Sequence, residues 1–308
     1  MSPSLVEKQK TTEPRLGTAR VRFKNILVAT DFSEGAHEAL RAAISIARYF
    51  DGQLLLLHVA APVLYSMEVG TISPELLDVN VNAAKQRLEA LVQAEPELKR
   101  IPHNEIVTST PILDAISEAV AVHHIDLVVT GTHGSSGLEK LALGSVAESV
   151  LRYSHTPVMV VGPNAAVNRV LFRSVLLATD LEIGCLRPAQ YAASVAEENN
   201  AKLTLVNVVR PSTRAPEETR ALTEGRVLDK LKQLLPVDAE LWCRPTLRVE
   251  FGEASEAVLN AAKTEAADLI VVGVRHKAAL ADHAPWATVS KIIRGAHCPV
   301  LAVPAHVS

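Results

Sequence analysis

Three segments in the first half of this chain recur in the second half, in the same order. The first pair is offset by 149 residues and the other two by 142. A repeat of this length predicts two domains that share one fold. The matching pairs are FKNILVATDFS (23–33) with FRSVLLATDLE (172–182), DLVVTG (126–131) with DLIVVG (268–273), and RYSHTPVMVV (152–161) with RGAHCPVLAV (294–303).

Length and charge agree with two globular domains and exclude several classes of protein. The 308 residues divide into domains of ~150 residues, each able to bury a core of its own. The 31 basic and 34 acidic residues are well mixed and give a net charge of −3, so no basic surface for nucleic acid is expected. No apolar run reaches the ~18 residues of a membrane span, and the polar N-terminus does not resemble a secretory signal. We expect a disordered tail over 1–21, a first domain over 22–163 and a second over 170–305, with a joint short enough to favour packed domains.

All three cysteines, Cys185, Cys243 and Cys298, lie in the second half and lack CxxC spacing. This pattern favours free thiols in a reducing compartment, the cytoplasm, over a disulfide framework or a zinc site. Cys298 precedes an apolar run and is expected to be a small buried hydrophobe.

Short apolar runs alternate with amphipathic helical patterns in both halves, which predicts an α/β fold with a parallel sheet. The strongest runs are continuous, as in strands covered on both faces. A helical stripe runs from Ala36 to Phe50 and ends at Asp51-Gly52, another helix is predicted over Pro74–Ala94, and a third is predicted to begin with Thr110 as cap and Pro111 at its first position. The predicted strands are Ile26–Thr30, Gln53–Ala60, Glu105–Thr108, Leu127–Thr130 and Pro157–Val161, then Val175–Thr179, Lys202–Val208, Arg248–Phe251, Leu269–Val272 and Pro299–Val303.

A glycine loop follows the fourth predicted strand of the first half. Gly131, Gly134 and Gly137 lead to Gly144-Ser145 at the start of the next helix, in the spacing G-x2-G-x9-G-[ST]. Glycines allow close backbone approach to an anion, and a helix N-terminus offers unpaired N–H groups to phosphate. In open parallel sheets, ligands lie beyond the carboxyl ends of strands where the winding reverses. Asp31, after the first strand, would face that crevice and could accept from a ribose hydroxyl or hold Mg²⁺ beside phosphates.

The second half does not repeat this loop. His276 stands at the position of Gly134, and Trp286 and Ala287 replace Gly144-Ser145. An indole at a glycine position would fill the space that a phosphate needs. We therefore predict that the second domain does not bind nucleotide in the same way, with Trp286 acting as a core plug.

The segments VATDFS, LHV (57–59), DLVVTGTHG and SHTPVMVV resemble, in that order, the ATP-binding branch of the universal stress protein family. The resemblance covers about Arg22 to Ala305 as two tandem copies. It implies two Rossmann-like domains, each a five-stranded parallel sheet in the order 3-2-1-4-5 with helices on both faces. It also implies that family members pair through their last strands, so the two halves are expected to form an intramolecular pseudo-dimer, and a homodimer of chains stays open.

The resemblance also implies where the parts of an adenine nucleotide lie. The backbone of Val59 would contact the base, and Asp31 would lie near the ribose and phosphates. Gly131, His133 and Gly134 would approach the ribose and α-phosphate, and Gly144 with Ser145 the β/γ-phosphates. The complete predicted site is Ala29, Thr30, Asp31, Val59, Gly131, Thr132, His133, Gly134, Gly144, Ser145 and Val146.

Structural roles compete with these assignments. Ser145 and Glu148 also fit a capping box, so Ser145 is a candidate helix cap. Asp31 is a candidate support for the next helix, where Ser33 is a possible cap, and its recurrence as Asp180 favours a structural role. His58 lies in a predicted strand and is expected to be a satisfied core or crevice residue.

Three functions fit the sequence. The first is a stress-response regulator that binds ATP, ADP or AMP in the first domain and acts on an unidentified regulatory protein. The second is an interaction scaffold with a vestigial site, and the third is a slow Mg²⁺-dependent ATPase. The loop has no G-K-[ST] lysine, and no Ser/His/Asp set or G-x-S-x-G elbow is present, so nothing indicates efficient turnover.

Overall fold

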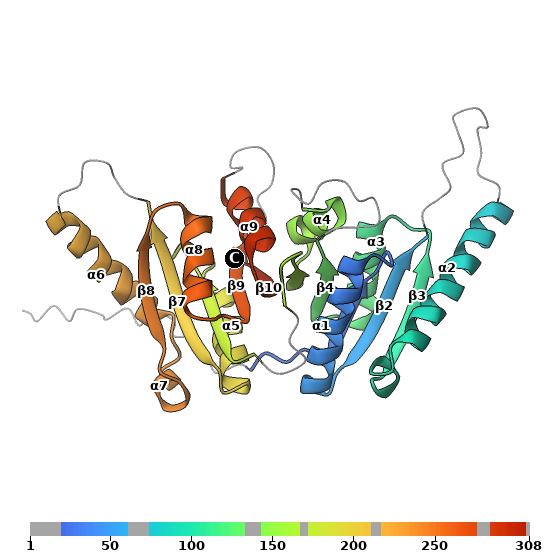
Figure 1. Cartoon of the computed structure of the whole chain (residues 1–308), viewed down its shortest axis with the longest axis horizontal. Coiled ribbons are helices and arrows are strands. Elements are labelled where there is room, and N and C mark those ends of the chain that lie inside the picture. The colour runs from blue at the N-terminus through green and yellow to red at the C-terminus, as the bar shows by residue number, and fades with distance from the viewer. Residues whose placement is uncertain are drawn as a thin grey trace, which may run out of the picture.

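The computed structural model describes residues 20–60, 74–132, 143–166, 172–210, 217–275 and 284–305. The two halves of the chain lie side by side (Figure 1) and join in one ten-stranded sheet of order β3-β2-β1-β4-β5-β10-β9-β6-β7-β8. Each half is therefore a parallel five-stranded sheet with the predicted 3-2-1-4-5 order. No helix of the described residues is both long and apolar enough to cross a bilayer.

The first half alternates strands and helices as predicted, and most boundaries lie within two residues of the expected ones. Its strands are β1 (Asn25–Ala29), β2 (Gln53–Val59), β3 (His103–Thr108), β4 (Leu127–Gly131) and β5 (Val158–Val161). Its helices are α1 (Glu34–Phe50), α2 (Pro74–Ala94), the short 3-10 helix η1 (Leu98–Arg100), α3 (Ile112–His123) and α4 (Ser145–Tyr153).

The second half repeats this order, with a short α-helix before its third strand where the first half has the 3-10 helix η1. Its strands are β6 (Ser174–Ala178), β7 (Lys202–Val209), β8 (Thr246–Phe251), β9 (Leu269–Val274) and β10 (Val300–Pro304). Its helices are α5 (Leu186–Glu198), α6 (Glu217–Gln233), α7 (Ala239–Trp242), α8 (Ala254–Thr264) and α9 (Ala284–Gly295).

Two hydrophobic cores cover the two faces of the sheet. Side chains alternate along β1, where Ile26 and Val28 enter one core and Leu27 and Ala29 the other. The first core contains residues of α1, α2, α5, α6 and α7, and the second contains residues of α3, α4, α8 and α9. Because each core draws on both halves, the two domains are packed together rather than tethered.

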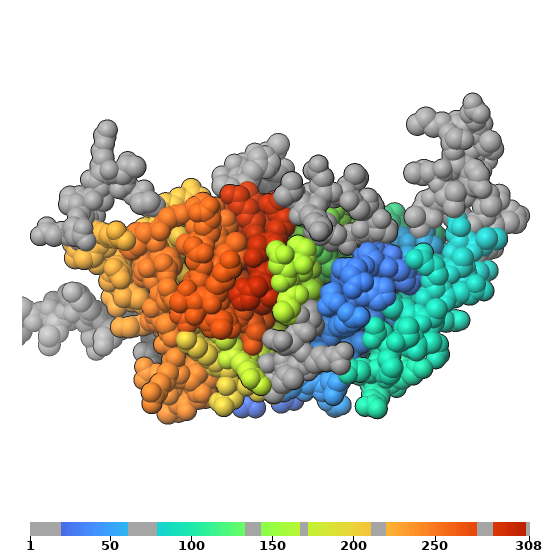
Figure 2. Space-filling model, viewed as in Figure 1, coloured from blue at the N-terminus to red at the C-terminus, as the bar shows by residue number. Residues whose placement is uncertain are grey.

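The halves meet at an antiparallel pairing of β5 with β10, in which Met159 lies opposite Leu301. This confirms that the two last strands pair within one chain. In Figure 2 the red C-terminal segment lies directly beside yellow-green residues of the joint, where the Ala166 N–H donates to the His297 carbonyl at 2.9 Å. The last described residues of the predicted tail also reach the second half, since the Val21 N–H donates to Ser194 Oγ at 2.6 Å. Residues 1–19 lie outside the described residues.

Helix ends show where sequence reasoning succeeded and where it was wrong. Ser33 caps α1 by accepting from the Ala36 N–H at 3.2 Å, and Asp51 ends the helix in the left-handed conformation. The predicted start of α3 is wrong by one residue. Pro111 (φ −52°, ψ 140°) is the N-cap rather than the first helical residue, and Thr110 instead exchanges hydrogen bonds with Thr108. Proline offers no side-chain acceptor, so α3 has no side-chain cap.

The three cysteines are free, and Cys298 is buried. Burial away from water raises the pKa of the Cys298 thiol to about 12. This agrees with its predicted role as a small hydrophobe.

Candidate functional site

The predicted site lies at the carboxyl ends of β1 and β4, two neighbouring parallel strands. The chain leaves β1 toward β2 on one side and returns to β4 on the other, so the winding reverses between them. Ala29 and Thr30 are buried at the end of β1, Thr132 is buried after β4, and Val59 ends β2 half-buried. These residues meet at one edge of the sheet, whereas His133 and Gly134 lie outside the described residues.

A tight turn follows β1. Thr30 Oγ1 accepts from the Phe32 N–H at 3.1 Å, and Asp31 Oδ1 accepts from the Ser33 N–H at 3.0 Å. Phe32 takes a positive φ of 63°. Asp31 therefore has the predicted structural role, because its carboxylate holds the turn that presents Ser33 as the cap of α1.

His58 supports the same turn from β2. Its Nδ1 lies 2.8 Å from the Thr30 carbonyl oxygen, which can only accept, so Nδ1 carries the proton. The imidazole also packs on Phe32, with ring centroids 4.5 Å apart. His58 is thus a satisfied, half-buried residue of the crevice, which is one of the two roles that the sequence left open.

Gly131 brings β4 against the start of α1. A Cβ at this position would lie 2.5 Å from the Gly35 carbonyl oxygen, a backbone atom that has no rotamer to change. This glycine is therefore required for packing, independently of any ligand.

The two ends of the glycine loop are joined to each other. The Gly144 N–H donates to the Thr132 carbonyl at 2.7 Å, which places the start of α4 beside the end of β4. The first helical bond of α4 runs from the Glu148 N–H to the Gly144 carbonyl at 2.9 Å. The amides of Ser145, Val146 and Ala147 therefore have no acceptor within the helix.

The capping box predicted at Ser145 is wrong. Gly144 is the N-cap residue (φ −57°, ψ 144°), Ser145 is the first helical residue, and no side chain caps α4. Glu148 instead pairs with Arg152 at 2.6 Å. An uncapped helix start with exposed Ser145 and Val146 suits an anion. The donors present therefore fit a phosphate group.

The turn after β6 in the second half has the same hydrogen bonds as the turn after β1. Thr179 Oγ1 accepts from the Leu181 N–H at 3.1 Å, and Asp180 Oδ1 accepts from the Glu182 N–H at 3.0 Å. Asn207 Nδ2 donates to the Thr179 carbonyl at 2.8 Å, where the first half uses His58. The turn is therefore a property of the fold and not of the ligand site alone.

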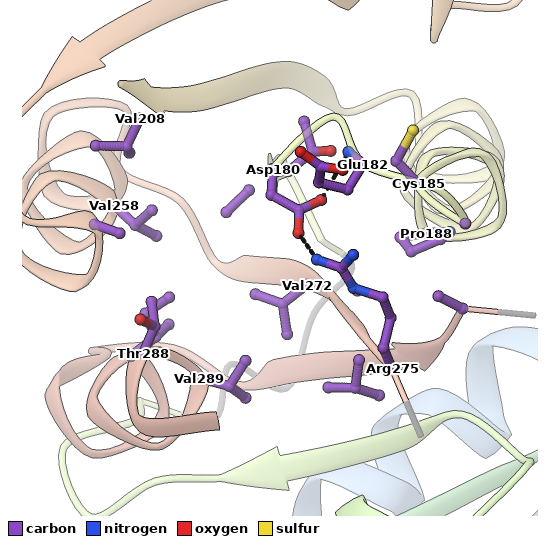
Figure 3. A pocket seen from close by; sticks show the side chains of 18 of the residues that line it. Asp180, Glu182, Cys185, Pro188, Val208, Val258, Val272, Arg275, Thr288 and Val289 are labelled. Carbon is purple, nitrogen blue, oxygen red and sulfur yellow. Dashed lines mark hydrogen bonds and ion pairs between the residues drawn. The ribbon is translucent and has the colours of Figure 1, made fainter. Parts of the chain in front are cut away.

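The residues beyond this turn differ between the two halves. The second carboxylate oxygen of Asp180 accepts from Arg275, which stands at the position of His133 (Figure 3). A cavity of about 510 Å³ opens at this edge, and Trp286 lines it. Trp286 is only half-buried and donates from Nε1 to Glu148 Oε1 of α4 at 3.2 Å, so it is not the buried core plug that the sequence suggested. His276 lies outside the described residues.

Sequence reasoning did not assign a role to the aspartate that opens the DLVVTG and DLIVVG segments. Asp126 Oδ2 accepts from the N–H groups of Lys24 (2.8 Å) and Asn25 (3.1 Å). Asp268 accepts from the equivalent N–H groups, with Oδ2 from Arg173 (2.7 Å) and with Oδ1 from Ser174 (3.1 Å). Burial outweighs these hydrogen bonds and raises the pKa of both carboxyls. The repetition of aspartate in both segments was the available signal.

The fold and the crevice define a tandem α/β protein of the Rossmann-like type, with a phosphate-compatible helix start in one half. Two regions of the chain, 22–162 and 171–304, match the model of the universal stress protein family. The chain belongs to this family.

Some relatives match along nearly the whole chain, and others match about half of it. A universal stress protein of Mycolicibacterium smegmatis is 25% identical over 290 residues, which cover 90% of this chain and 96% of that protein. Universal stress protein MJ0531 of Methanocaldococcus jannaschii is 34% identical over 151 residues, covering 45% of this chain and 82% of its own. The crystal structure of a universal stress protein from Archaeoglobus fulgidus matches with a TM-score of 0.69 at 21% identity, covering 92% of this chain and 98% of that one. This last likeness supports the fold.

Proposed function

We propose that the first domain binds an adenine nucleotide, ATP or else ADP or AMP, and that the bound nucleotide regulates contacts with a protein partner in a stress response. The observation that carries this proposal is the junction of Thr132 with Gly144, which sets the uncapped start of α4 beside the carboxyl ends of β1 and β4. The second half has Trp286 at the equivalent position.

Each group of the nucleotide has a matching part of the chain under this proposal. The amides of Ser145 and Val146 would hold the terminal phosphates together with the side chain of Ser145. The backbone at Val59 would face the base. Asp31 would accept from the ribose or hold Mg²⁺, whose remaining ligands would be phosphate and water oxygens.

Regulation by this site requires two states with different affinities for the nucleotide. The Thr132–Gly144 junction is a candidate for the element that differs between these two states. A phosphate bound at the start of α4 would act on the same helix that contacts Trp286 of the second half. A homodimer would need a surface other than β5 and β10, since these two strands pair with each other.

Nucleotide content tests the proposal. Freshly purified protein is denatured, and released nucleotide is identified by chromatography and mass spectrometry. We expect about one adenine nucleotide per chain, and loss of it in Gly144→Trp, which copies the second half into the first. The backbone of Gly144 is in a conformation open to any residue, so the substitution introduces no backbone strain at this position.

Trp286→Phe is the matched control, because it alters the equivalent position of the second half and should keep the nucleotide. A protein that is empty and does not bind added ATP with Mg²⁺ would overturn the proposal and favour an interaction scaffold. A Mg²⁺-dependent hydrolysis rate that Gly144→Trp abolishes would instead support a slow ATPase.

A further inference from the structure

The cavity of the second half has an apolar floor. Its volume is about 510 Å³, within the range of small-molecule sites. Val206, Val258, Val272, Val289 and Ile292 line it and are buried in the fold. Figure 3 shows Val208 and Val258 on one side of the cavity and Cys185 and Pro188 on the other. An occupant would thus bury a mainly apolar body.

One ion pair lies at the rim, where Arg275 reaches across to Asp180 (Figure 3). Both carboxylate oxygens of Asp180 already accept, one from Arg275 and one from the Glu182 N–H. Arg275 has five N–H donors, and among the described residues Asp180 is its partner. Its side chain is 29% exposed. The lining contains two carboxylates, Asp180 and Glu182, and two guanidinium groups, Arg275 and Arg210. Because Arg275 has more N–H donors than its hydrogen bond to Asp180 uses, it can also donate to an acceptor group on a ligand.

The tail of a nucleoside triphosphate does not suit this cavity. The indole of Trp286 lines it where the first half has Gly144, so a ring occupies the space at the position of the glycine. The occupant should accordingly be compact and carry a single small anionic group.

We propose that the second-half cavity binds a small organic carboxylate with an apolar body. The carboxylate pairs with the guanidinium of Arg275, and the body packs on Val206, Val258 and Val272. Arginine and carboxylate form charge-assisted hydrogen bonds in matched planar geometry. This site is separate from the proposed nucleotide site, so either one can be absent while the other is present.

Octanoate is a suitable probe, and 1-octanol is its uncharged counterpart. Binding to the full chain is followed by calorimetry and by the fluorescence of Trp286 in a Trp242→Phe background, which leaves Trp286 as the reporter. We expect one octanoate per chain, tighter binding of octanoate than of octanol, and a change in Trp286 emission.

Two variants separate the charge from the cavity. Arg275→Ala should weaken octanoate binding about tenfold, in line with the loss of one charge-assisted hydrogen bond, and leave octanol unaffected. Ala254→Phe places a ring in the cavity that Ala254 lines and should abolish binding of both probes. If Ala254→Phe does not fold, the rim variant Arg275→Ala still decides.

Failure of octanoate to bind would overturn the inference, as would equal binding by wild type and Arg275→Ala. Competition between octanoate and added ATP with Mg²⁺ would also overturn it, because it would place the probe in a nucleotide site.

Discussion

The two halves have the same turn at the carboxyl end of their first strand, but the residues that line the neighbouring crevice differ. In the first half, Ser33 caps α1, and the helix begins at Glu34. In the second half, Glu182 stands at the position of Ser33, α5 has no side-chain cap, and the helix begins only at Leu186. The residues released from the first helical turn, 182–185, line the cavity instead. In the second half, the absence of a capping serine and the later start of the helix therefore go together with a cavity wall made of residues 182–185.

This comparison shows which residues belong to the fold and which belong to a site. Two features occur in both halves and therefore belong to the fold. One is the turn held by Asp31 or Asp180. The other, here called the aspartate clamp, is the carboxylate of Asp126 or Asp268 that accepts from two backbone N–H groups. Gly144 and Trp286 stand at equivalent positions. Gly144 begins α4 without a side chain, whereas Trp286 places an indole in the wall of the cavity. The differences at that position are the ones that should carry function.

The largest expected effect breaks the packing of the strand end. Gly131→Ala puts a Cβ 2.5 Å from the backbone oxygen of Gly35, whereas Gly273→Ala meets only Pro188 Cγ at 3.0 Å. We expect the first substitution to lower the free energy of unfolding by about 1–3 kcal/mol and the second by less than about 1 kcal/mol. Guanidinium unfolding of the two variants measures the difference. Equal losses would contradict the contrast between the two helix starts.

The second prediction tests the buried aspartate that both halves share, Asp126 in the first and Asp268 in the second. Asp126→Ala and Asp268→Ala each remove the acceptor of two backbone N–H groups. Orphaned buried donors cost about 1–3 kcal/mol, and the loss should be similar in the two halves. The asparagine variants keep an acceptor and should recover part of the stability. A loss confined to one half would show that the clamp is not a common device.

The third prediction concerns a cap that only the second half has. Glu253 caps α8 by accepting from the Ser255 hydroxyl at 2.6 Å and the Glu256 N–H at 2.8 Å, whereas Pro111 at the equivalent position caps α3 with no side chain. These hydrogen bonds lower the pKa of Glu253 to about 2. The stabilisation by its carboxylate is therefore complete above about pH 4.5 and lost as the pH falls toward 2.

Glu253→Gln should accordingly be less stable than wild type at pH 7, by roughly 0.5–1 kcal/mol for an exposed cap. The gap should close as the pH falls through that window. Thermal unfolding at several pH values gives the comparison, with Pro111→Ala as the control whose effect should not change with pH. A gap that stays constant down to pH 2 would exclude the ionised cap.

The smallest expected effect lies at the boundary between the halves. The indole N–H of Trp286 donates to Glu148 at 3.2 Å. Trp286→Phe keeps an aromatic ring and removes this donor. In a double-mutant cycle with Glu148→Gln, we expect a coupling of about 0.5 kcal/mol in unfolding. Strict additivity would indicate that this contact does not connect the two domains.

The sequence predicted the sheet well because its strands are continuous apolar runs, and their order followed from the family resemblance. It predicted helix starts less well. Thr110 and Ser145 both have side chains that commonly cap helices, but the backbone places Pro111 and Gly144 at the N-cap positions. Side-chain type alone does not specify which residue leaves the helical conformation.

Contacts between distant residues were beyond a single sequence. Arg275 meets Asp180 across 95 residues, and Trp286 meets Glu148 across 138. Neither pair has a local pattern that would reveal it. Trp286 was visible at the position of Gly144, but the sequence did not show that it lines a cavity together with residues 182–185, which precede the later start of α5.

The stoichiometry of nucleotide binding tests the central claim most directly. Calorimetric titration of nucleotide-free full chain with ATP and Mg²⁺ should give one site per chain, absent in Gly144→Trp and retained in Trp286→Phe. Two sites per chain, or one site that survives Gly144→Trp, would contradict the account that only the first half holds nucleotide.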